Sequence, residues 1–222
     1  MYKFWWIVHK DLVAEYRSLR VWPTMLLLGI VVALVFSLQL ELLPDQKRTM
    51  LGGLLWLAIF FAGMTAIERS FAAEREDDCW DGLRLFPVPW SQIYWSKLIA
   101  NTVALGALEC LLVPLFFGLS GAPVGSHLPQ LALVAILANV GLAAVGTLVS
   151  ALATSLGRSG NLLVVLVLPL AIPVILAAAE ATRLIAESHI DAAWWRWVQF
   201  LGAFAVVFVI VGTLLFPAAV ED

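Results

Sequence analysis

Six long apolar runs dominate this sequence and limit the folds that it can adopt. A helix needs about 20 apolar residues to cross a bilayer, and its backbone polar groups must be satisfied within it. With 62% hydrophobic and 13% charged residues, the chain is too apolar for a soluble domain. We therefore predict an all-α membrane protein whose residues 1–222 form a single transmembrane domain. The six predicted spans are 22–40, 50–67, 93–119, 130–156, 162–179 and 198–220.

The first 20 residues lack a continuous apolar core but show a helical period. Apolar side chains recur at spacings of three and four, whereas Lys3, Lys10 and Arg17 share another face. This pattern favours an amphipathic helix over residues 1–20 that lies in the membrane interface, with its basic side toward the headgroups. An irregular cytosolic tail is the alternative. The apolar face consists of Trp5, Val8, Leu12, Tyr16 and Leu19.

The distribution of basic residues predicts the orientation of the spans. Short cytoplasmic loops of membrane proteins carry an excess of Lys and Arg. On one side of the predicted topology lie nine of the 13 basic residues, and four lie on the other. We therefore expect both termini and the loop after the second span to be cytoplasmic. The smaller set comprises Lys47, Arg48, Arg183 and Arg196.

The segment Glu68–Pro89, between the second and third spans, concentrates charge in an otherwise apolar chain. Nine of the chain's 29 charged residues lie in its first 17 positions, residues 68–84. It does not match a calcium loop, because Cys79 and Val88 stand where oxygen ligands are required. Pro87 and Pro89 would end a helix before the third span. We predict a short amphipathic helix that docks on a partner, with a simply solvated loop as the alternative.

Catalytic and metal-binding motifs are missing from the sequence. It contains no GxxxxGK[ST], HExxH or GxSxG, so the chain cannot hydrolyse ATP alone. The three histidines are far apart, and no Cys/His cluster suggests a metal. The net charge of −3 gives no indication of nucleic-acid binding. We therefore assign no catalytic residue, no metal ligand and no bound cofactor.

Three residues within the predicted spans are candidates for an intramembrane function. Glu109 lies deep in the third span, where a carboxylate is costly and must face the bundle or a cavity. Pro169 and Pro173 lie one turn apart in the fifth span and predict a kink. A structural hydrogen bond and ordinary helix packing are the alternative interpretations. Small residues in the fourth span predict close packing, among them Ala143, Gly146, Thr147, Ser150, Ala151 and Thr154.

A family resemblance covers essentially the whole chain. The matching residues are Asp11-Leu12 with Glu15 and Arg17, Gly53 to Trp56, Glu68-Arg69 with Phe71, Asp77, Leu83, Leu85, Pro87, Pro89, Lys97, and Arg158 to Gly160 leading into Leu166–Leu176. With these residues the chain resembles the haem exporter protein B family, the ABC-2-type permease subunits of bacterial cytochrome c maturation transporters. The chain departs from the family pattern at Asp78-Cys79, where Gly-Ser is usual.

The resemblance implies partners and a role. It implies a multi-pass protein of the bacterial inner membrane that pairs with a second copy of itself and with a separate ABC ATPase subunit, which binds the ATP. It further implies a haem-handling membrane subunit with its small accessory protein, a periplasmic haem chaperone, and haem as the cargo. Glu68–Pro89 would then be the coupling segment, and its expected docking residues are Glu68, Arg69, Phe71, Glu74, Asp77, Asp81, Leu83, Leu85, Pro87 and Pro89.

Other functions remain open at this level. An ABC-2 permease that exports a lipid or a drug would have the same pattern of spans. An intramembrane enzyme could use Glu109 with Asn101 or Glu180, although no catalytic constellation supports it. A scaffold that only assembles the complex is a third alternative.

Overall fold

The computed structural model describes residues 2–17, 21–38, 44–76, 89–121, 127–155 and 161–221. Within these ranges the regular structure is helical, as predicted. The helices are α1 (Tyr2–Arg17), α2 (Val21–Leu38), α3 (Pro44–Glu76), α5 (Trp90–Ser120), α6 (Leu128–Ser155), α7 (Asn161–Ala186) and α8 (Ala192–Glu221).

Five of these helices are long and apolar enough to cross a membrane, so the chain is a multi-pass membrane protein. Helix α2 is 18 residues long and apolar, and the stretch Leu26–Val35 is the part of it for which side-chain burial is described without a gap. The sixth span therefore stays a prediction. The five apolar stretches are Gln46–Thr65, Trp90–Ser120, Leu128–Leu152, Leu166–Ala186 and Ala192–Ala219.

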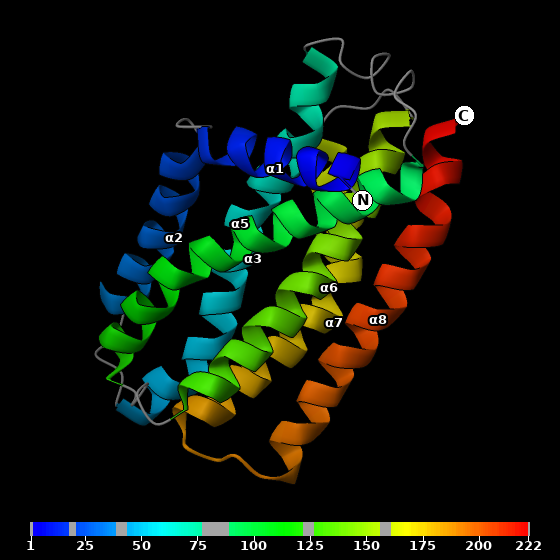
Figure 1. Cartoon of the computed structure of the whole chain (residues 1–222). Coiled ribbons are helices and arrows are strands. Elements are labelled where there is room, and N and C mark those ends of the chain that lie inside the picture. The colour runs from blue at the N-terminus through cyan, green and yellow to red at the C-terminus, as the bar shows by residue number, and fades with distance from the viewer. Residues whose placement is uncertain are drawn as a thin grey trace.

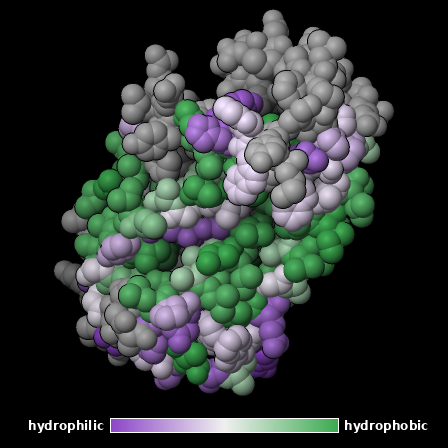
Figure 2. Space-filling view, in the orientation of Figure 1, coloured by the Kyte–Doolittle hydropathy of each residue, from purple (hydrophilic) through white to green (hydrophobic). Residues whose placement is uncertain are grey.

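Helix α1 lies across one end of the bundle that the other helices form, and packs mainly against α5 (Figure 1). A helix is thus present where the N-terminal periodicity predicted one, and its place in a membrane interface stays a prediction. Both termini lie at this same end, and the last turns of α3 project beyond α1 (Figure 1). Hydrophobic side chains cover most of the middle of the face that Figure 2 shows. This surface is the one expected to contact lipid tails.

Helix α6 is at the centre of the bundle, because it packs against α3, α5, α7 and α8. Every residue from Gly141 to Ser150 is buried. The small residues predicted to allow close packing are responsible: a Cβ on Gly146 would lie 2.7 Å from Ile67 Cδ1 of α3. Close helix approach in membranes depends on such small residues, since lipid tails are as apolar as leucine.

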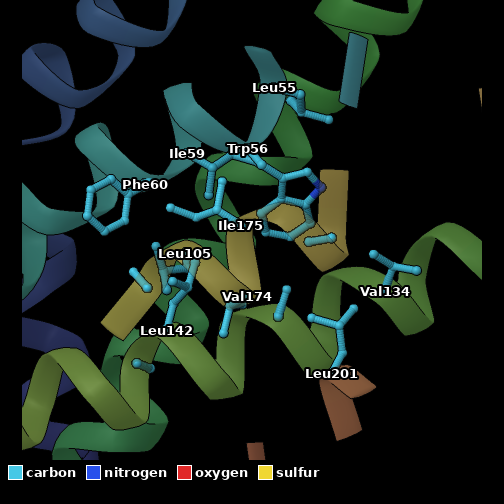
Figure 3. Packing of buried hydrophobic residues seen from close by; sticks show 14 of the residues in the cluster. Leu55, Trp56, Ile59, Phe60, Leu105, Val134, Leu142, Val174, Ile175 and Leu201 are labelled. Carbon is cyan, nitrogen blue, oxygen red and sulfur yellow. The ribbon is translucent and has the colours of Figure 1, made fainter. Parts of the chain in front are cut away.

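The helix pair α3 and α7 contains the core around Trp56. The Trp56 side chain lies close to Ile59 and Ile175 (Figure 3). One turn earlier, α3 approaches the α7 backbone so closely that a Cβ on Gly52 would overlap the Ala179 carbonyl oxygen. Only glycine fits at this crossing.

Two helices continue past the ends that hydropathy predicted. Helix α3 does not stop at Ile67, and α7 runs seven residues beyond Ala179 to Ala186. Polar residues that favour helix extend each of them, because loss of hydropathy does not end a helix. A Schellman motif ends α7: His189 N donates to Leu184 O (2.8 Å), and Ser188 takes the left-handed position with φ 59°.

Candidate functional site

The charged segment begins as part of α3. Residues Glu68 to Glu76 form its last turns, so the first part of the predicted separate helix is a continuation of the second span. This part includes Glu68, Arg69, Phe71 and Glu74. The predicted docking residues Asp77, Asp81, Leu83, Leu85 and Pro87 lie outside the described residues.

The length of α3 places these turns beyond the apolar part of the helix. The apolar run ends at Ile67 in the sequence, and the helix continues for nine residues to Glu76. At about 1.5 Å per residue this extension adds roughly 14 Å. Pro89, the last predicted docking residue, is exposed and precedes α5 as its N-cap, and its carbonyl accepts a hydrogen bond from Gln92 N (2.9 Å). The two membrane helices α3 and α5 thus lead directly into and out of the charged segment.

A buried polar pair joins α5 and α6 inside the bundle. Asn139 Nδ2 donates to Glu109 Oε2 over 2.8 Å, and the two residues are only 3% and 5% exposed. The second carboxylate oxygen, Glu109 Oε1, and the amide oxygen, Asn139 Oδ1, are buried and have no hydrogen-bond partner within the described part of the chain. Glu109 therefore faces the bundle, as its cost in lipid requires.

A second polar pair joins the same two helices eight residues away. Asn101 Nδ2 donates to Thr147 Oγ1 over 2.9 Å, and both side chains are buried. Glu109 follows Asn101 by eight residues along α5, and its partner Asn139 precedes Thr147 by eight residues along α6. The pairs are therefore two steps of one antiparallel register, about 12 Å apart. Polar residues at a spacing of eight on both helices are the signal that sequence reasoning missed.

The grouping considered for an intramembrane enzyme is not formed. Asn101 bonds to Thr147, whereas Glu109 bonds to Asn139. Glu180 accepts from Arg183 Nε over 2.9 Å at the far end of α7. Each of the three residues thus has a different partner. Among the described residues, no group of three His, Cys, Asp or Glu side chains could hold a metal ion.

Pro169 and Pro173 both lie inside α7, which runs from Asn161 to Ala186. Each proline lacks the N–H that would bond to the carbonyl four residues earlier. Pro169 is exposed and Pro173 is half-buried. The helix continues through both positions, and the predicted kink and its functional role stay predictions.

An ionic cluster at the C-terminal end of α7 connects this helix to α3. Arg183 forms ion pairs with Glu180 (2.8 Å) and Glu187 (2.7 Å), and Thr49 Oγ1 donates to Glu187 Oε1 (3.3 Å). The sequence alone places these residues only in polar segments between spans. Their contacts depend on α3 and α7 lying side by side, which local sequence does not reveal.

Asp191 starts α8 at the same end. Its Oδ1 accepts hydrogen bonds from Ala193 N (2.8 Å) and Trp194 N (3.3 Å), which makes it the N-cap. These backbone bonds, with that of Ala193 the largest contribution, lower the pKa of Asp191 below its ordinary value. The cap fixes the position where the last membrane helix begins.

Comparison with known proteins shows the family to which the chain belongs. Heme exporter protein B of Rhodobacter capsulatus is 34% identical over 135 residues, which cover 61% of this chain and 62% of that protein. The match thus spans less than two thirds of that relative. Heme exporter protein B of Pseudomonas aeruginosa is 30% identical over 178 residues, 80% of this chain and 79% of the relative. The Escherichia coli K12 protein of the same name is 29% identical over 178 residues, 80% of each chain. The profile of the family described as CcmB protein matches residues 2–222, so the chain belongs to the CcmB protein family.

Proposed function

We propose that this chain is the permease subunit of an ATP-driven ABC transporter in cytochrome c maturation. In this role it couples a partner ATPase to haem translocation or to release of the haem-loaded chaperone. Membership of the CcmB family carries the proposal, since the relatives are named heme exporter protein B. The multi-pass helical fold agrees with a permease, and the absence of a phosphate-binding loop from the sequence supports a role for a separate ATPase.

Helix α3 is the element best suited to transmit the motion of such an ATPase. It runs without interruption from Pro44 to Glu76, past the cluster around Thr49 and into the charged segment 68–89. A continuous helix is stiff, so a displacement at Glu76 reaches the crossing with α7 at Gly52. We further propose six spans in the inner membrane, with both termini and the coupling segment 68–89 in the cytoplasm. The shared end of the bundle at which both termini lie supports their placement on one side of the membrane (Figure 1).

Docking is tested by replacing Asp77, Asp81 and Leu85 together with alanine. The tagged chain should lose copurification of the ATPase subunit and stimulation of ATP hydrolysis, because the replaced side chains supply the contact. A matched control replaces the exposed Arg196 and Gln199, at the start of α8, with alanine and should retain both. Unchanged copurification and hydrolysis in the triple variant would contradict the docking role.

Transmission through α3 is tested separately. Ala73→Pro should break α3 inside the coupling segment, beyond the apolar part of the helix, because proline removes a backbone hydrogen bond. We expect this variant to assemble with the ATPase yet to mature no c-type cytochrome, whereas Ala73→Leu should support maturation. Such a result would also exclude a role as a scaffold only. Normal maturation of c-type cytochromes in Ala73→Pro would show that α3 need not be a continuous helix to transmit the displacement.

The cargo class is tested in a strain from which the gene is deleted. Loss of c-type cytochromes, restored by the wild-type gene, supports the haem role. Normal cytochromes together with altered lipid or drug export would instead support the alternative permease.

A further inference from the structure

Among the described residues, the membrane helices that pack around Glu109 place no charge beside it that could balance a carboxylate. Helix α5 packs against α1, α2, α3, α6 and α8. The stretches 26–35, 50–67, 128–155 and 197–220 of these neighbours contain no Asp, Glu, Lys, Arg or His. Lys97, the nearest charged residue along α5, is 12 residues away, about 18 Å along the helix. The charged residues of α1 belong to a helix across the end of the bundle (Figure 1).

The level of Glu109 in the bundle follows from its neighbours. A Cβ on Gly63 of α3 would overlap Leu105 Cδ2, and one on Gly29 of α2 would lie 2.6 Å from Leu112 Cδ2. Glu109 lies between these two contacts along α5. It is therefore beside the apolar middle of α2 and α3, where an unpaired ion is least tolerated.

The hydrogen-bond inventory of the pair is one donor short. Asn139 Nδ2 donates to Glu109 Oε2, which leaves two buried acceptors, Glu109 Oε1 and Asn139 Oδ1. The Asn101–Thr147 pair of the same register has its donor and acceptor matched and is neutral. A single hydrogen on Glu109 Oε1 would remove the charge, supply the missing donor and require no additional space.

We propose that Glu109 and Asn139 form a proton-binding site inside the membrane. Glu109 takes one proton from the aqueous phase, so that an O–H bond forms at Oε1, and this hydroxyl donates toward Asn139 Oδ1. Asn139 Nδ2 keeps its bond to Glu109 Oε2. A monovalent cation fits less well, since the pair offers it only two free oxygens within the described part of the chain. The site does not depend on the identity of the transported cargo.

Opening of the α5–α6 interface to water is then coupled to release of the proton from Glu109. A carboxyl group that becomes hydrated at neutral pH ionises, whereas one enclosed as it is here holds its proton. Any conformation that exposes Glu109 to water must therefore release this proton. The proton is in this sense a ligand of the closed interface.

The experiment is infrared difference spectroscopy of the full chain in lipid nanodiscs at neutral pH. The spectrum of wild type minus Glu109→Gln should contain the C=O band of a protonated carboxylic acid, and this band should shift in heavy water. Glutamine is nearly isosteric with the protonated acid, so the variant should fold. Asn139→Leu should change the frequency of the acid band without abolishing it, because its hydrogen-bond partner is lost.

Thr147→Val is the matched control, since it removes a buried hydrogen bond from the same helix pair and should leave the acid band unchanged. The proposal would be overturned if the spectrum of wild type minus Glu109→Gln contained the bands of an ionised carboxylate in place of the acid band. A difference spectrum with no acid band would overturn it as well. An acid band that is identical in wild type and Asn139→Leu would overturn the role assigned to Asn139.

Discussion

Trp56 of α3 donates its indole N–H to Thr182 Oγ1 of α7 over 2.9 Å, and both side chains are fully buried. Two further links join the same helices, the Gly52 crossing and the bond from Thr49 to Glu187. The half of α3 remote from the charged segment is thus held firmly against α7. A helix held at one end and extended at the other is suited to transmit a displacement.

Removal of the Trp56 bond should destabilise the bundle. Trp56→Phe leaves Thr182 without its donor and should reduce the free energy of unfolding by about 1–3 kcal/mol, the usual cost of an unsatisfied buried group. Thermal unfolding in nanodiscs measures the change. Trp195→Phe, at a side chain that is 52% exposed, is the control and should have little effect. Equal stability of Trp56→Phe and wild type would contradict the importance of this bond.

Two adjacent glycines of α3 should respond in opposite ways to the same substitution. Gly52→Ala places a Cβ against the Ala179 carbonyl oxygen and should cost about 1–3 kcal/mol, because the helices must separate. A Cβ on Gly53, by contrast, would have nothing within 4 Å of it. Gly53→Ala should therefore be neutral, or stabilise by up to about 1 kcal/mol through helix propensity. Unfolding of the two variants under identical conditions tests the crossing, and a similar loss in both would refute it.

The Asn101–Thr147 bond should appear as a coupling energy. In a double-mutant cycle with Asn101→Ala and Thr147→Val, we expect about 0.6 kcal/mol, the average found for hydrogen bonds between membrane helices, and at most about 1.7 kcal/mol. A cycle of Thr147→Val with Leu111→Ala, a lipid-facing residue that is 53% exposed, should give a coupling near zero. Coupling of the same size in both cycles would mean that the measured energy does not come from this bond.

The cap at Asp191 should make stability depend on pH. Because its pKa is lowered in the folded state, its contribution is present above the unfolded pKa and is lost as the pH falls through the folded pKa. Asp191→Ala should therefore lower Tm at neutral pH, and the difference from wild type should shrink below about pH 4. His189→Gln is the control for the neighbouring imidazole. A difference between Asp191→Ala and wild type that is constant over this range would argue against the role of the carboxylate.

The amino-acid sequence by itself determined the class of the protein. Hydropathy identified the five stretches of the described residues that are apolar enough to span a membrane, because the bilayer imposes the length and composition of each helix. The small residues of the fourth run correctly predicted a closely packed helix. Glu109 was recognised as a residue that must face the bundle, since exposure of a carboxylate to lipid is costly.

Only the tertiary structure decided which residues meet. The partners Asn139 for Glu109 and Thr182 for Trp56 lie 30 and 126 residues away, and no local pattern encodes such distances. Helix ends were also decided by hydrogen bonds and caps, as at Ser188, where hydropathy carries no signal. The physical reason is that hydropathy measures where a helix can lie, whereas packing and hydrogen bonding between helices fix its register and its partners.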